Sequence, residues 1–132
     1  MSVVFDTHAI LALYLDEKGG DRVAKLLVDV RDGKIHGYMN IVNMTELFYI
    51  LQRKSGALAE EKERNIKSYK VKIVPVDSRS NLWREAALIK SENSLSLADA
   101  FAAATAISLK SRLVTSDKEF DKIGKKLALE KI

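Results

Sequence analysis

Four acidic residues have the greatest potential for chemistry in this sequence, and their positions predict one shared site. Asp6 and Asp117 each follow a run typical of a β-strand, so both are expected at the same edge of a parallel sheet. Glu46 and Asp99 lie one turn into predicted helices and are flanked by apolar residues, which places both carboxylates near the sheet. Four like charges in one place repel each other unless a cation neutralises them. The pattern therefore predicts a site for Mg²⁺ or Mn²⁺, which bind a few carboxylates and take phosphate oxygens as further ligands.

Each acid also has an ordinary structural interpretation as a helix cap. A carboxylate at the start of a helix is stabilised by free backbone amides and by the helix dipole. Asn43-x-x-Glu46 and Ser96-x-x-Asp99 both have the spacing of a capping box, in which the acid turns back to the amide of the capping residue. Taken one at a time, the acids predict caps, and only their joint pattern predicts a metal site.

Composition narrows the chemistry further. The chain has 132 residues, no cysteine and a net charge of +4. The absence of cysteine removes disulfides, thiolate zinc sites and cysteine nucleophiles, and it leaves oxygen ligands for a metal. The positive charge favours a polyanionic partner such as a nucleic acid. The N-terminal residues lack the pattern of an export signal and the apolar stretch 98–109 is interrupted by polar residues, so we expect a cytoplasmic protein with no membrane segment.

Patterns of strands and helices alternate along the chain, and this order predicts an α/β sandwich. The helical pattern over 96–110 is apolar on nearly every side and is expected at the centre. We expect one domain over residues 1–132, with a central, mainly parallel sheet of four to five strands flanked by helices. Ligands are expected at the carboxyl ends of the strands. The predicted strands cover residues 2–5, 35–39, 71–76, 112–115 and 127–132.

Four segments, taken in their order and spacing, carry a resemblance to a known family. They are Val-Val-Phe-Asp-Thr at 3–7, Asn-Met-Thr-Glu-Leu at 43–47, Ser-Leu-Ala-Asp-Ala-Phe-Ala-Ala-Ala-Thr-Ala at 96–106 and Leu-Val-Thr-Ser-Asp-Lys-Glu-Phe at 113–120. With these segments the chain resembles the PIN-domain ribonucleases, particularly the compact VapC-like toxins of toxin–antitoxin pairs. The resemblance spans the whole chain.

The resemblance implies a PIN-like three-layer sandwich and a metal-dependent endoribonuclease. It implies that Asp6, Glu46, Asp99 and Asp117 hold the metal, and that Thr115, in the T-x-D pattern, helps to order metal-bound water. It also implies RNA products with 5′-phosphate and 3′-hydroxyl ends, a homodimer and a peptide-like antitoxin partner. A cation held by the acids would activate water for attack on a phosphodiester, so no side-chain base is obligatory.

Three residues near the predicted site each allow more than one interpretation. His8 stands where many relatives carry Asn or Ser, and we expect it on the helix surface or in a dimer contact rather than on the metal. Asp121 either extends the acidic cluster or, as we expect, is a solvated acid paired with Lys118 or Lys125. Lys118, next to Asp117, is the first candidate for guiding single-stranded RNA.

Other functions are possible and differ in what they require. Arg31-x-x-x-x-His36 matches the short motif of the metal-independent HEPN ribonucleases, but the turn signal at Asp32-Gly33 separates the two residues. A haloacid-dehalogenase-type phosphatase needs a second Asp where His8 stands. A catalytically silent PIN-like module that binds RNA or protein, and a PIN nuclease in RNA processing, remain as alternatives.

The predicted helices carry more apolar residues than one core requires, which predicts assembly with a second copy. Leu11, Tyr14, Leu47 and Ile50 lie on predicted helices, and we expect some of this surface to be buried against a second copy of the chain.

Overall fold

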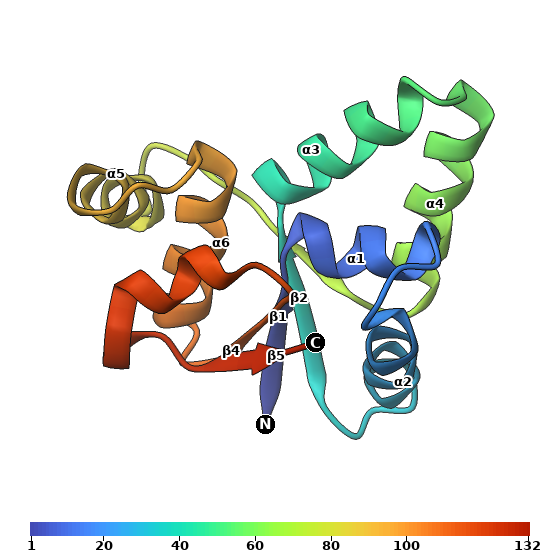
Figure 1. Ribbon diagram of the computed structural model, residues 1–132, viewed down its shortest axis with the longest axis horizontal. Coiled ribbons are helices and arrows are strands. Elements are labelled where there is room, and N and C mark those ends of the chain that lie inside the picture. Colours follow the sequence, from blue (N-terminus) through green and yellow to red (C-terminus); the bar gives the residue numbers. More distant parts are fainter.

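Five short strands, all parallel, form one sheet in the order β3-β2-β1-β4-β5 (Figure 1). The computed structural model describes residues 1–132. Its parallel sheet confirms the predicted α/β class. The strands are β1 (Ser2–Phe5), β2 (His36–Asn40), β3 (Lys72–Val74), β4 (Arg112–Thr115) and β5 (Leu129–Lys131).

Seven helices cover the two faces of this sheet and complete the predicted three-layer sandwich (Figure 1). Successive side chains of a strand point to opposite faces. Accordingly, Val3 and Phe5 join the core under α1 to α4, whereas Val4 joins the core under α5 and α6. The helices are α1 (Thr7–Tyr14), α2 (Gly20–Arg31), α3 (Ile41–Gln52), α4 (Gly56–Ser68), α5 (Leu82–Glu92), α6 (Leu97–Ser108) and the 3₁₀ segment η1 (Lys118–Lys126).

The strand order creates a switch point between β1 and β4. The chain runs outward from β1 to β2 and β3, and then returns to the other side of β1 as β4 and β5. In open parallel sheets, ligands bind beside the carboxyl ends of the strands at such a point. Asp6 directly follows β1 and Thr115 is the last residue of β4, so both lie at this edge.

The start of α3 differs from the prediction. The helix begins at Ile41, and Asn40 caps it, because the Asn40 Oδ1 atom accepts a 2.8 Å hydrogen bond from the Val42 amide. The predicted capping box between Asn43 and Glu46 is therefore wrong. A tertiary contact explains the earlier start: the buried Asn40 Nδ2 atom donates to Thr105 Oγ1 on α6 at 2.9 Å.

The start of α6 agrees with the prediction. The Ser96 hydroxyl accepts a 3.1 Å hydrogen bond from the Asp99 amide, as expected for a serine N-cap.

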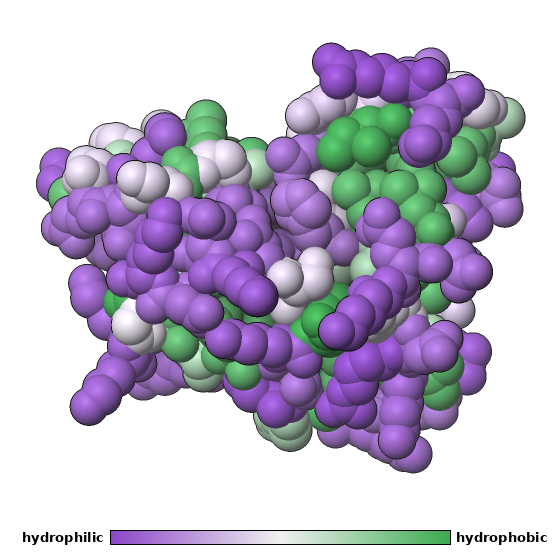
Figure 2. Space-filling model, viewed as in Figure 1, coloured by the Kyte–Doolittle hydropathy of each residue, from purple (hydrophilic) through white to green (hydrophobic).

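Two of the four apolar residues proposed for a subunit contact lie inside the molecule. Leu11 and Leu47 are only 7% and 1% exposed, and Tyr14 donates from its hydroxyl to Asn65 Oδ1 at 2.7 Å. Leu11 and Leu47 therefore have no surface to offer a second copy, whereas Tyr14 and Ile50 are partly exposed, and the homodimer stays a prediction. Figure 2 shows an apolar patch over α3 and α4 instead. The large apolar residues that are exposed include Ile41, Tyr49, Trp83, Leu88 and Leu97.

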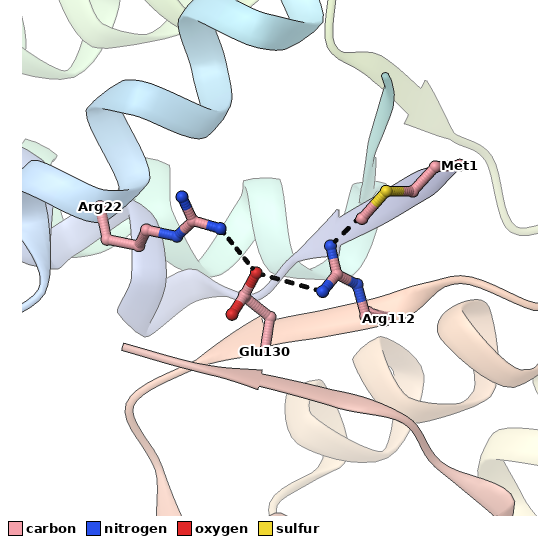
Figure 3. A network of polar contacts seen from close by, with 4 residues as sticks. All are labelled: Met1, Arg22, Arg112 and Glu130. Atoms are coloured by element: carbon pink, nitrogen blue, oxygen red, sulfur yellow. Dashed lines mark hydrogen bonds and ion pairs between the residues drawn. The ribbon is translucent and has the colours of Figure 1, made fainter. Parts of the chain in front are cut away.

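A polar network holds the edge strand β5 in place (Figure 3). Glu130 Oε1 accepts a hydrogen bond from Arg22 Nη2 on α2 at 3.0 Å and forms an ion pair with Arg112 Nη1 on β4 at 3.3 Å. These contacts link the last strand both to its neighbour and to a helix. None of the helices has the length and apolarity that crossing a membrane requires.

Candidate metal site

Asp6 is held at the switch point by hydrogen bonds to both of its carboxylate oxygens. The side chain caps α1, with Oδ1 accepting from the Ala9 amide at 2.7 Å. Oδ2 accepts from Thr115 Oγ1 at 2.5 Å, and the same hydroxyl accepts from the Asp117 amide at 2.9 Å. Thr115 therefore connects the ends of β1 and β4 and fixes the orientation of a carboxylate that is fully buried.

Asp99 approaches Asp6 from the first turn of α6. Asp6, His8 and Asp99 each offer one potential ligand atom, and these atoms all lie within 4.8 Å of one another. Asp99 is 8% exposed, so the two carboxyls meet at a place that is largely shielded from solvent. This group brings together two of the four predicted metal ligands.

Glu46 and Asp117 lie outside this group of three but act on it through their charge. Both carboxylates raise the pKa of Asp99. Glu46 Oε1 is buried and has no hydrogen-bond partner. Asp117 caps η1, with Oδ1 accepting from the Glu119 amide at 2.9 Å. The other three acids thus lie near Asp99, Asp6 by ligand distance and Glu46 and Asp117 by the effect of their charges, although the capping interpretation also holds for Asp6 and Asp117.

Burial is the main cause of the raised pKa values of Asp6 and Asp99 in this cluster. It raises the pKa of Asp6 to about 6, although hydrogen bonds from Thr115 and Ala9 partly offset the rise. Burial also raises the pKa of Asp99, and the charges of Asp117 and Glu46 add to that rise. The electrostatic effect of the nearby His8 side chain lowers the pKa of both acids. Ionised carboxylates in this position need a compensating positive charge, which a cation would supply.

His8 lies closer to the acids than the sequence predicts. It is exposed, as expected of a helix-surface residue, but its imidazole lies beside Asp6 and Asp99. Side chains in the first turn of a helix lean toward the N-terminus, and Asp6 caps the helix that carries His8. The position of His8 two residues after the cap was the signal that could have placed it near the acids.

Asn43 is a second residue whose contacts beside the acids the sequence does not predict. It is fully buried in the first turn of α3, and its Nδ2 atom donates to the Ala98 carbonyl oxygen at 3.0 Å. The backbone carbonyl oxygen of Asn43 accepts a hydrogen bond from Thr7 Oγ1 at 3.2 Å. Thr7 follows Asp6 and Ala98 precedes Asp99, so Asn43 ties together the three helix starts around the cluster.

Asp121 does not join the site. Its Oδ1 atom pairs with Lys131 Nζ at 2.7 Å, so the predicted pairing with Lys118 or Lys125 is wrong, although the acid is solvated as expected. Lys118 is exposed next to Asp117 and forms no ion pair. Its side chain is therefore free to meet a polyanion.

The HEPN-like arrangement is absent. Arg31 ends α2 and forms an ion pair with Asp32 at 3.3 Å, whereas His36 begins β2. The two residues therefore do not share a helix face.

Comparisons with solved structures reveal the same fold in several proteins, including two VapBC structures. VapBC2 from Rickettsia felis, bound to a DNA fragment from its promoter, has a TM-score of 0.76 and 18% identity, with 99% of this chain and 98% of that chain covered. VapBC-1 from nontypeable Haemophilus influenzae has a TM-score of 0.68 and 21% identity, with 99% and 98% covered. FitAcB from Neisseria gonorrhoeae has a TM-score of 0.69 and 22% identity, with 96% and 95% covered.

Sequence comparisons identify the family. No curated protein sequence matches this chain. A family model described as PIN domain, however, matches residues 3–126 and thus includes all four acids of the candidate site. Together with the parallel sheet and the acidic cluster at its switch point, this match shows that the chain belongs to the PIN domain family.

Proposed function

We propose that this PIN domain is a divalent-cation-dependent endoribonuclease in which Asp6, Glu46, Asp99 and Asp117 hold Mg²⁺ or Mn²⁺. The observation that carries the proposal is the approach of Asp6 and Asp99, two shielded carboxyls whose pKa values are raised by burial and by neighbouring negative charge. Acids with raised pKa values that lie close together are typical of functional sites. A bound cation would stabilise the ionised form of both carboxyls at neutral pH.

The donor set fits a hard divalent cation. The four acids supply carboxylate oxygens, which Mg²⁺ and Mn²⁺ prefer. The buried Glu46 Oε1 atom has no hydrogen-bond donor within the protein. A bound cation would give this oxygen the partner that buried polar atoms normally have. When bound, the cation supplies an activated water nucleophile and offsets the charge of the scissile phosphate.

The protein groups have separable tasks in this proposal. Thr115 orients Asp6 through the 2.5 Å bond and couples it to the backbone of Asp117. Ser96 fixes the helix start that carries Asp99. These supporting contacts keep the carboxylates in one arrangement, which matters because small displacements of a catalytic group cost rate.

The substrate that we propose is single-stranded RNA, cleaved to leave 5′-phosphate and 3′-hydroxyl ends. The net charge of +4 favours a polyanion, and Lys118 stands free beside Asp117 where it can contact a phosphate. Hydrophilic surface lies between the α5–α6 side and the α3–α4 side of the face drawn in Figure 2. Such a surface suits a solvated phosphodiester chain.

The biological role that we propose is the toxin of a VapBC-type pair, acting as a homodimer and neutralised by an antitoxin protein. Support comes from the fold shared with chains of the Rickettsia felis and Haemophilus influenzae VapBC structures. The exposed apolar residues Ile41 and Tyr49 on α3 offer a surface for a protein partner. A PIN nuclease in RNA processing and a catalytically silent binding module are the alternatives that the experiment must separate.

The direct test is cleavage of a fluorescently labelled single-stranded RNA by the purified chain. Cleavage with Mg²⁺ or Mn²⁺ that stops in EDTA supports the proposal. Cleavage that continues in EDTA contradicts the metal-dependent mechanism, and no cleavage of a varied set of RNA sequences with either cation favours the silent module.

A further inference from the structure

Asn43 occupies the point where the three helices that carry Asp6, Glu46 and Asp99 meet. Its Nδ2 atom donates to the Ala98 carbonyl oxygen at 3.0 Å and, more weakly, to Thr7 Oγ1 at 3.5 Å. One neighbour thus precedes Asp99 and the other follows Asp6. The side chain is fully buried, so these contacts are shielded from solvent.

The other end of the same amide has no partner. Asn43 Oδ1 and Glu46 Oε1, one helical turn apart on α3, are the two buried side-chain polar atoms in the chain without a hydrogen bond. Reversing the amide would place Oδ1 against the Ala98 carbonyl oxygen, so that contact fixes the orientation. Buried acceptors without donors are uncommon in folded proteins, and here both belong to the helix that carries one of the four acids.

Asn40 provides an internal comparison. It is equally buried, lies three residues earlier and also contacts α6. Both ends of its amide are satisfied, since Oδ1 accepts from the Val42 amide at 2.8 Å and Nδ2 donates to Thr105 Oγ1 at 2.9 Å. Holding α3 against α6 therefore does not by itself require an unsatisfied oxygen.

A hydrated divalent cation would bring the missing donors. Mg²⁺ in carboxylate sites keeps several water molecules, and each water has O–H groups available to nearby acceptors. We infer that Asn43 is a positioning residue of the metal site, whose Oδ1 atom accepts a hydrogen bond from a water molecule in the hydration shell of the cation. This inference rests on the proposed metal site, and it assigns the Nδ2 atom the separate task of holding α3 to α6.

Three variants separate the two ends of the amide. Asn43→Ala removes both the Oδ1 acceptor and the clamp, which is the hydrogen bond from Nδ2 to the Ala98 carbonyl oxygen. Asn43→Asp keeps an acceptor oxygen but loses the donor to Ala98. Thr105→Val removes the partner of Asn40 from the same interface between α3 and α6 without touching Asn43, so it is a matched control for structural damage.

The readouts are Mn²⁺ affinity by isothermal titration calorimetry and the unfolding temperature in EDTA. Loss of a contact that orients a metal site from outside its ligands typically weakens metal affinity about 10- to 100-fold, and we expect Asn43→Ala in that range. We expect Thr105→Val to unfold at a lower temperature but to bind Mn²⁺ like the wild type. We expect Asn43→Asp to unfold at a lower temperature as well, yet to bind Mn²⁺ no more weakly than the wild type.

Two results would overturn the inference while leaving the metal site intact. One is wild-type Mn²⁺ affinity in Asn43→Ala. The other is an equal loss of affinity in Asn43→Asp and Asn43→Ala, because a clamp alone predicts that these variants behave alike. If the wild type itself takes up no Mn²⁺, the proposed metal site fails and this inference fails with it. If Asn43→Ala does not fold, the comparison of Asn43→Asp with Thr105→Val decides the question.

Discussion

Thr115 and Asp6, 109 positions apart in the sequence, are joined by a 2.5 Å hydrogen bond between Oγ1 and Oδ2 at the buried junction of β1 and β4. The threonine hydroxyl also accepts the Asp117 amide at 2.9 Å. One hydroxyl thus serves as donor to one acid of the candidate site and as acceptor from the backbone of another.

Replacing Thr115 with Val keeps the shape of the side chain and removes both bonds. A buried Asp6 oxygen and the Asp117 amide lose a partner, so we expect the free energy of unfolding to fall by about 1–3 kcal/mol. RNA cleavage should fall too, because Asp6 is no longer oriented. Thr115→Ser retains the hydroxyl and should recover most of both properties in urea denaturation and cleavage assays. A Thr115→Val protein as stable and active as the wild type would show that the bond is dispensable.

Asp99→Asn should stabilise the metal-free protein near neutral pH. Asp99 has a raised pKa because of burial and the charges of Asp117 and Glu46, so its ionisation opposes folding. We expect a gain of roughly 1 kcal/mol at pH 7 in EDTA, which is within the usual range for a stabilising substitution. A raised folded pKa favours the folded state at low pH, and that contribution is lost as the pH rises through the folded value. The advantage of the variant should therefore shrink on acidification.

Added Mn²⁺ supplies the control for Asp99→Asn. The cation binds the folded wild type more tightly than the variant, so it should reduce or reverse the difference in unfolding temperature. If Asp99→Asn instead destabilises the metal-free protein at pH 7, then the cost of burying a charged Asp99 beside other acids is not the dominant effect, which contradicts the described environment.

The sequence was most informative where one residue type follows a strand. Asp6 and Asp117 were correctly expected at one sheet edge, because parallel strands end on the same side and the runs before both acids are short and apolar. The paired spacing of Ser96 and Asp99 also marked a real helix start. Local patterns of this kind need no knowledge of distant contacts.

The errors come from contacts that are remote in sequence. Asn40 and Asn43 are both good capping residues, and the choice between them depends on the Thr105 hydroxyl, 65 positions from Asn40. Asp121 pairs with Lys131 because β5 returns to the sheet beside it, which helical spacing does not reveal. Leu11 and Leu47 pack in the same core, but the sequence does not reveal which helices pack against each other, so it does not predict their burial.

Asp6 should titrate far above an ordinary aspartic acid in the metal-free protein. Burial raises its pKa to about 6, and a cation should lower that pKa because it binds the ionised form. Carboxyl carbon NMR in EDTA should therefore give a midpoint near that value, and addition of Mg²⁺ should move the midpoint to lower pH. The raised pKa stabilises the folded state below about pH 4 and this contribution is lost as the pH approaches 6. A midpoint near 3.8, unchanged by Mg²⁺, would contradict the described environment.

The toxin role predicts a cellular effect that depends on the acidic site. Expression of the wild-type chain in a bacterial host should arrest growth, because an unrestrained ribonuclease depletes essential RNA. Asp99→Asn should accumulate as folded protein without arrest. Growth curves with matched expression levels check this outcome. Unimpaired growth with the wild type, combined with RNA cleavage in vitro, would favour a role in RNA processing.

The central claim is that the acidic cluster carries out metal-dependent cleavage of RNA, and a matched pair of variants on neighbouring positions tests it most directly. Asp117→Asn keeps an oxygen that can cap η1 but removes a charge that acts on Asp99, whereas Asp121→Asn removes only an exposed acid paired with Lys131. The measurement is the initial rate of single-stranded RNA cleavage in Mn²⁺, with EDTA as the reference. We predict that Asp117→Asn loses at least about 100-fold in rate and that Asp121→Asn stays close to the wild type, as expected when a group that stabilises the transition state is removed. Equal rates for the two variants, or a wild-type rate that EDTA does not change, would contradict the account.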